Sequence, residues 1–127
     1  MNALWFSRHQ PSAEQLGEIA TKGFTLVDVE SGVALGARSI ESGDDCRAIV
    51  ESLIALAAKH SAKAVFGVFP TPILGWAFRD AEQAILLGDW SRSPISLWAA
   101  WNVTRTPEGG KPTFCHKTWQ TVGVLTA

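Results

Sequence analysis

Short apolar segments alternate along the chain with longer segments of helical periodicity, and this alternation limits the folds open to it. Apolar and β-branched residues fill positions 4–7, 24–29 and 64–69. The first and third of these segments are each followed closely by a helix start. Strands that alternate with helices predict a mainly parallel sheet, because a parallel neighbour is reached only through a crossover connection.

Helix signals stand between the predicted strands. Ser12 and Gln15 have the spacing of a capping box, and Gly23 is placed to end the helix that follows. Apolar residues at i, i+3, i+4 and i+7 predict a second helix that ends near residue 60. A third helix is predicted with Thr71 as its cap and Pro72 as its first residue.

The remaining segments complete the order of elements. Residues 30–42, which are rich in glycine, are predicted to be a connecting loop. Residues 95–103 read as a strand, 106–112 as a hairpin tip and 113–125 as an antiparallel return strand. We therefore expect one domain over residues 1–127: a small Rossmann-like, three-layer α/β/α sandwich whose mainly parallel sheet ends in an antiparallel hairpin.

Composition excludes several classes of function. Hydrophobic residues make up 46% of the chain, so a packed core is expected. The net charge is −1, so strong electrostatic binding of long nucleic acid is not expected. No apolar run is long enough for a membrane span, and no signal peptide opens the chain. The two cysteines, Cys46 and Cys115, are far apart in the sequence and do not have the C-x-x-C spacing of a zinc site or a redox pair. This favours reduced thiols in a cytoplasmic protein.

Known cofactor signatures are missing too. The first strand is not followed by G-x-G-x-x-G, and no P-loop occurs, so we expect no nicotinamide, flavin or P-loop nucleotide. The three histidines are not spaced as a local metal cluster, so no metal is expected either.

Candidate binding residues come from the predicted topology, because ligands of open α/β sheets bind beyond the carboxyl ends of the parallel strands. The residues expected at this edge are Ser7, Arg8, His9, Thr71, Asn102, Arg105, Lys111 and His116. As a set they are rich in donors and cationic, which suits a phosphate group. Each alone also has a purely structural reading, as a strand cap, a turn residue or a surface charge.

Two family resemblances bear on the opening of the chain. Residues 4–9, Leu-Trp-Phe-Ser-Arg-His, look like the start of the histidine phosphatases, although Gln10 replaces the expected glycine and no late Gly-His pair follows. The same strand end followed by Pro-Ser-Ala-Glu-Gln at 11–15 resembles small stand-alone proteins of type III CRISPR systems, which are minimal relatives of the CARF (CRISPR-associated Rossmann fold) domain.

The second resemblance implies a homodimer that binds a cyclic oligoadenylate at the carboxyl edges of its sheets, and in some members a metal-independent ring nuclease. By that resemblance Arg8 would stabilise the phosphorane and His9 or His116 would act as general acid or base. Ser7, Thr71, Asn102, Arg105 and Lys111 would hold phosphate or ribose. A sensor or sponge without turnover, an interaction subunit anchored by tryptophans, and a phosphatase remain alternatives, so whether the protein is an enzyme stays open.

Overall fold

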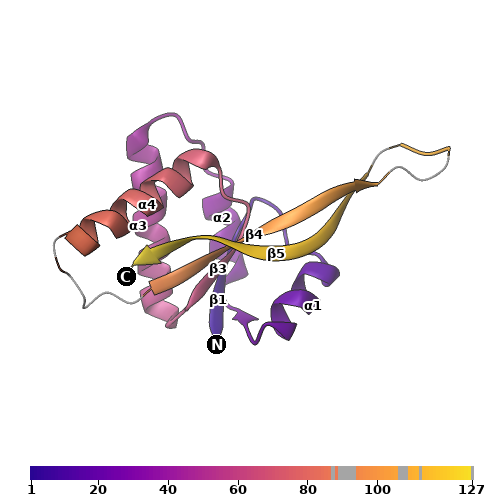
Figure 1. The fold of residues 1–127 in the computed structure, drawn as a ribbon, viewed down its shortest axis with the longest axis horizontal. Helices are drawn as coiled ribbons and strands as arrows, with labels where there is room; N and C mark the ends of the chain where they lie inside the picture. Colours follow the sequence, from indigo (N-terminus) through magenta and orange to yellow (C-terminus); the bar gives the residue numbers. More distant parts are fainter. Residues whose placement is uncertain (87, 89–93, 106–108, 112, 127) are drawn as a thin grey trace.

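The structure, a computed structural model, describes residues 1–86, 88, 94–105, 109–111 and 113–126; at 81, 84, 85, 101–105, 113–115, 117 and 126 it describes the backbone only. The elements follow in the order β1 (Asn2–Phe6), α1 (Ala13–Thr21), β2 (Thr25–Leu26), α2 (Val29–Gly36), α3 (Gly43–His60), β3 (Ala64–Gly67), α4 (Thr71–Leu86), β4 (Pro94–Arg105) and β5 (Thr113–Thr126). The predicted α/β class is confirmed (Figure 1).

The five strands form one sheet in the order β2-β1-β3-β4-β5. All neighbouring pairs are parallel except β4 and β5, which form the predicted antiparallel hairpin. Phe6 of β1 lies beside Gly67 of β3, and Gly67 lies beside Ala99 of β4. β1 and β3 therefore end at one level, whereas β4 continues beyond it with β5.

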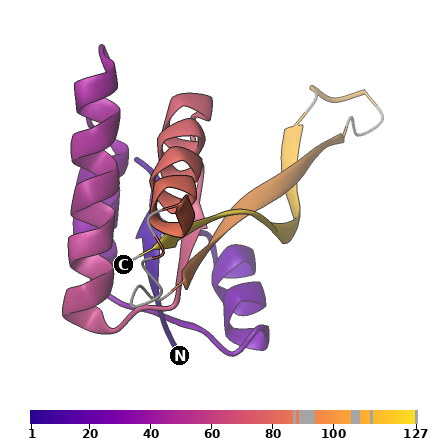
Figure 2. The same cartoon turned by 60° about the vertical axis from the view of Figure 1, so that its left-hand side comes forward.

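The part of the hairpin beyond this level projects from the fold as a two-stranded arm (Figures 1 and 2). β4 has 12 residues and β5 has 14, and two register shifts, at Leu97/Trp98 and at Trp101/Asn102, take up the difference. Such β-bulges increase the local twist of a strand pair. The arm therefore leaves the sheet at a bend rather than in line with the other strands.

Helices cover both faces of the sheet, as expected for three layers. On one face Leu4 and Phe6 pack with residues of α3 and α4 such as Leu53 and Ile73. On the other face Trp5 joins a second cluster that includes Ile19 of α1. Figure 2 shows α3 and α4 side by side, with α1 apart from them. β1 can serve both clusters because successive side chains of a strand point to opposite faces.

The prediction of a loop over residues 30–42 was wrong, because α2 occupies its first half and lies against the backbone of β1. A Cβ added to Gly32 would lie 1.8 Å from the carbonyl oxygen of Trp5, and one added to Gly36 would lie 2.4 Å from the carbonyl carbon of Ser7. Glycine weakens a helix by about 1 kcal/mol per residue, so the sequence signal is faint. The contact with β1 therefore stabilises α2 in spite of its glycines. β2 is also shorter than the strand that was predicted over residues 24–29.

The predicted helix ends are confirmed at α1 and shifted at α4. Ser12 and Gln15 form the complete capping box, and Gly23 has a φ of +84°. At α4 the carbonyl of Pro70 accepts from the N–H groups of Ile73 and Leu74 at 2.9 and 3.2 Å. Pro70 is therefore the cap, and Thr71 is the first helical residue. None of the described helices combines the length and apolar character that crossing a bilayer requires.

Candidate functional site

A cleft of about 460 Å³ opens where β1 and β3 end, bordered by the segment between α2 and α3. One part of its lining, here called the polar rim, consists of Ser7, Arg8, His9, Arg38 and Ser39. The other part, the apolar wall, consists of Phe6, Leu35, Ile40, Ile49, Val68 and Pro70. The cleft is thus at the place where open α/β sheets bind ligands, and it combines donors with apolar surface.

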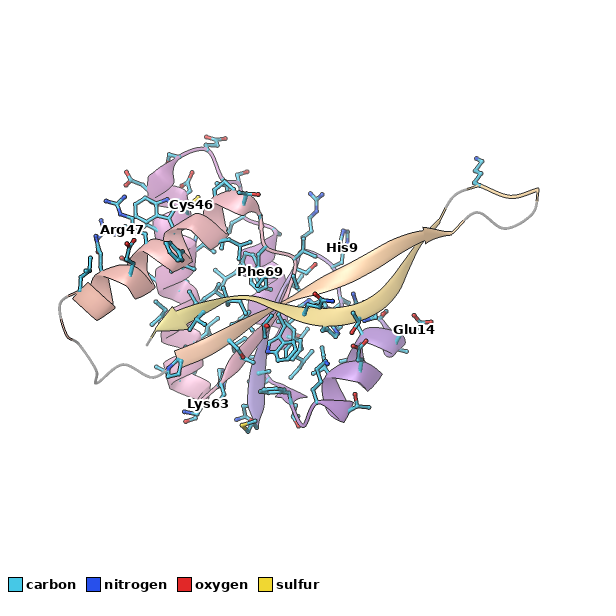
Figure 3. All side chains as sticks on the ribbon, in the orientation of Figure 1. His9, Glu14, Cys46, Arg47, Lys63 and Phe69 are labelled. Carbon is cyan, nitrogen blue, oxygen red and sulfur yellow. The ribbon has the colours of Figure 1, made fainter. Side chains whose placement is uncertain are left out.

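Two hydrogen bonds hold the turn after β1 in place. The Ser7 hydroxyl is buried at 6% exposure and accepts from the His9 N–H at 3.2 Å. The buried Trp5 indole Nε1–H donates to the His9 carbonyl at 2.7 Å. These bonds fix the backbone while the Arg8 and His9 side chains stay exposed, and Figure 3 shows His9 projecting outward at this edge. The predicted grouping of Ser7, Arg8 and His9 at one site is therefore present.

Arg38 is the cleft residue that sequence reasoning missed. It follows α2 directly, and its N–H donates to the Leu35 carbonyl at 3.2 Å, which closes the end of that helix. The signal that could have found it is the pair Gly32 and Gly36, whose i, i+4 spacing allows a helix to lie on a neighbouring backbone. Once α2 is placed, Arg38 necessarily falls beside the end of β1.

The cleft has a cationic lining. Arg8 and Arg38 both border it, and the lining contains no aspartate or glutamate. Within the described ranges neither guanidinium forms an ion pair. An unneutralised pair of guanidinium groups beside a hydrophobic surface favours an anion that also carries an apolar group. The described residues hold no group of three or more His, Cys, Asp or Glu placed to bind a metal.

The structure does not gather all predicted site residues here. Thr71 is exposed and adjoins the cleft-lining Pro70, but it does not itself line the cleft. Lys111 is exposed in the tip of the arm, which stands away from the helices in both views (Figures 1 and 2). The expectation that the tip hangs over the cleft is therefore not met.

Asn102 and Arg105 are placed by their backbone only, since their side chains lie outside the described part of the structure. Asn102 is three positions past Ala99, the last β4 residue paired with β3. Arg8 is two positions past Phe6, the last paired residue of β1. Both positions are thus at the carboxyl side of the sheet, two strands apart, or roughly 10 Å in the hydrogen-bonding direction.

His116 is on the other face of the sheet. Its ring lies 5.3 Å from that of Trp119, in the cluster covered by α1. Its Nε2 is 2.8 Å from Oε2 of Glu18, and its side chain is only 8% exposed. Its Nδ1 is buried and has no hydrogen-bond partner among the described residues. His116 therefore joins β5 to α1. Of the two histidines proposed as general acid or base, His9 borders the cleft and His116 does not.

No family model, curated protein or solved structure matches this chain.

Proposed function

We propose that the cleft binds a nucleotide through its phosphate and base, and that the physiological ligand is a cyclic oligoadenylate. The observation that carries this proposal is the pairing of Arg8 with Arg38 at one cleft that has no acidic lining residue. Guanidinium groups bind phosphate oxygens bidentately and keep their charge at any physiological pH.

The apolar wall supports a nucleotide over a simple anion. Within the apolar wall Val68 leaves 59% of its surface exposed and Pro70 is exposed as well, whereas Ile49 and Phe6 are almost fully buried. A planar base laid on this surface would cover apolar area while its phosphate reaches the polar rim. A cleft of about 460 Å³ lies at the lower end of the range for ligand pockets, so it fits one nucleotide rather than a whole ring.

The ring would therefore be shared with a second copy of the chain, which supplies an equivalent cleft. This part of the proposal rests on the resemblance to CARF-like proteins and on the size of the cleft. A two-fold symmetric ligand is matched by a two-fold symmetric pair of sites.

Cleavage of the bound ring would use groups of the polar rim, with solvent water serving the proton transfer that His9 does not. The ribose 2′-hydroxyl attacks the adjacent phosphorus, the bond from phosphorus to the 5′-oxygen breaks, and a 2′,3′-cyclic phosphate and a 5′-hydroxyl result. A base takes the 2′ proton and an acid supplies a proton to the leaving oxygen. His9 is the titratable side chain at the rim suited to one of these transfers, and Arg8 would stabilise the phosphorane.

Calorimetric titration tests binding. We expect the protein to bind cyclic tetra-adenylate and, more weakly, adenosine 5′-monophosphate, and to bind ribose 5-phosphate at least about tenfold more weakly still, because it lacks the base. Arg8→Ala and Arg38→Ala should each weaken binding about tenfold or more. Arg47→Ala is the matched control, since Arg47 pairs with Glu51 on α3 outside this cleft. Absence of binding, or equal loss with Arg47→Ala, would overturn the proposal.

Chromatography of the reaction products separates turnover from binding alone. Linear products that disappear with His9→Gln, while the affinity is retained, support a ring nuclease. Intact ligand at stoichiometric binding supports a sensor or sponge. Hydrolysis of p-nitrophenyl phosphate that is abolished by His9→Ala would favour the phosphatase-like alternative instead.

A further inference from the structure

The outer edge of β5 is open along its second half. β5 ends the strand order, and no strand of the described part lies beyond it. The Trp119 N–H donates to Oε1 of Glu18 at 3.1 Å, so it points away from β4 and the α1 carboxylate closes the edge at that residue. No such contact continues along residues 120–125 among the described groups. Within the described part of the chain, their outward N–H and C=O groups are available for pairing.

This stretch carries little of the usual protection of an edge strand. Residues 118–127 contain no charged residue and no proline, and Val122 and Val124 are each 41% exposed. Natural edges are commonly protected by charges, prolines or bulges. A bulge at Val122 bends this strand, but residues 123–126 stay in regular register with 94–97 of β4.

The helix that packs against β5 carries an exposed aromatic side chain. α4 packs against β5, and Cδ2 of Leu74 lies 4.0 Å from the Cβ position of Gly123. Phe78 is one helical turn further along, on the same side of α4 as Leu74, because residues i and i+4 share a face. It is 71% exposed. The helix that packs against β5 thus presents a large apolar side chain to solvent.

We propose that residues 123–126 of β5, which follow the bulge, pair antiparallel with the same residues of a second copy, and that Phe78 packs against the partner at this contact. A strand that pairs antiparallel with the same strand of a second copy is two-fold symmetric. The outward N–H groups of each copy therefore face the outward carbonyl groups of the other. Residues near the axis meet their own counterparts, and a charged strand would repel itself there. The absence of charged side chains over residues 118–126 removes that penalty.

Two short paired strands alone would bury too little surface for a stable dimer. Stable interfaces bury about 800 Å² on each partner, more than a pair of short strands supplies. A phenylalanine adds up to about 150–250 Å², so Phe78 and its neighbours on α4 make up an essential part. The paired strands run in opposite directions, so the two clefts face opposite edges of the joined sheet. This contact is therefore separate from the one proposed to share a nucleotide ring.

Analytical ultracentrifugation of the ligand-free protein tests the proposal. We expect a dimer in the micromolar range, with a dissociation constant raised about tenfold or more by Phe78→Glu and by Val124→Lys. Leu16→Glu is the control, because Leu16 is 44% exposed and belongs to α1 rather than to β5 or α4. Circular dichroism confirms that each variant is folded.

Hydrogen exchange adds a readout that does not depend on any variant. The outward-facing amides within residues 123–126 should lose protection on dilution below the dissociation constant, while those of β1 and β3 keep theirs. A monomeric wild-type protein throughout the micromolar range would overturn the proposal, as would a dimer that is unchanged by both charged substitutions. Neither result bears on the nucleotide cleft.

Discussion

Glu18 and His116 are joined by a hydrogen bond of 2.8 Å between Oε2 and Nε2, although they lie 98 positions apart in the sequence. The other oxygen of the same carboxylate accepts from Thr118 Oγ1 at 2.7 Å and from the Trp119 N–H at 3.1 Å. One side chain of α1 thus fixes the base of the arm. Because the carboxylate is the shared acceptor of all three bonds, its loss affects the whole junction.

Replacing Glu18 with Gln should lower the free energy of unfolding by about 2 kcal/mol, because hydrogen bonds to a charged acceptor contribute more than neutral ones. Urea denaturation measures the change. Glu14→Gln is the control, since Glu14 is exposed in the first turn of the same helix and should change stability by only a few tenths of a kcal/mol. Equal effects of the two substitutions would contradict the assigned role.

The same junction makes stability depend on pH. Burial raises the pKa of Glu18, but hydrogen bonds from Thr118 and His116 and from the Trp119 backbone outweigh it, so that the pKa lies below its ordinary value. The carboxylate therefore adds stability above its unfolded-state pKa of about 4.3, and this contribution is lost as the pH falls through the lower folded-state value.

Urea denaturation at several pH values below about 6 checks this dependence. The difference in unfolding free energy between the wild type and Glu18→Gln should shrink as the solution is acidified, because a protonated glutamate resembles glutamine. A difference that stays constant down to the lowest pH at which the protein folds would refute it.

Replacing Gly32 with Ala should destabilise the protein by about 3 kcal/mol, because the added Cβ would lie 1.8 Å from the Trp5 carbonyl oxygen and α2 would have to move off β1. Gly17→Ala is the control on α1, where a Cβ meets nothing within 4 Å. There the same substitution should stabilise by about 0.5–1 kcal/mol. Thermal or urea unfolding of the two variants gives the comparison, and shifts of the same sign would count against it.

Replacing Trp5 with Phe should weaken nucleotide binding several-fold, because the turn that carries Arg8 and His9 loses its bond from the indole N–H to the His9 carbonyl. The lost bond and volume should also cost about 2 kcal/mol of stability. Trp98→Phe loses a comparable indole bond, to Ser96 Oγ at 2.9 Å, but away from the cleft. Titration calorimetry should therefore show weakened binding in the first variant only.

Local signals predicted much of the fold. The capping box of Ser12 and Gln15, the left-handed Gly23 and the apolar β3 are each determined by a few neighbouring residues, and all three were predicted correctly. Gly67 allows β1 and β3 to approach closely, since an added Cβ would lie 1.9 Å from the Phe6 carbonyl oxygen of the adjacent strand. Arg8 and His9 were placed at the carboxyl edge because the end of a strand can be located from its own sequence.

The errors arose where a distant contact overrides a local preference. α2 forms through backbone contact with β1, so its two glycines indicated a loop until the neighbour was known. The placement of Arg38 depends on that helix and could not be predicted without it. His116 appeared to be a candidate for the cleft because its strand returns from that edge, but the register and the carboxylate of Glu18 put its ring on the opposite face.

The sequence by itself determined the α/β class, the hairpin and the group Ser7, Arg8 and His9, because these depend on periodicity and on residues adjacent in the chain. Only the tertiary structure decided that Arg38 completes the cleft, that His116 joins the arm to α1 and that β5 presents an open edge. Each of these depends on which segments lie next to each other, and that is set by packing between residues far apart in the chain rather than by the local pattern.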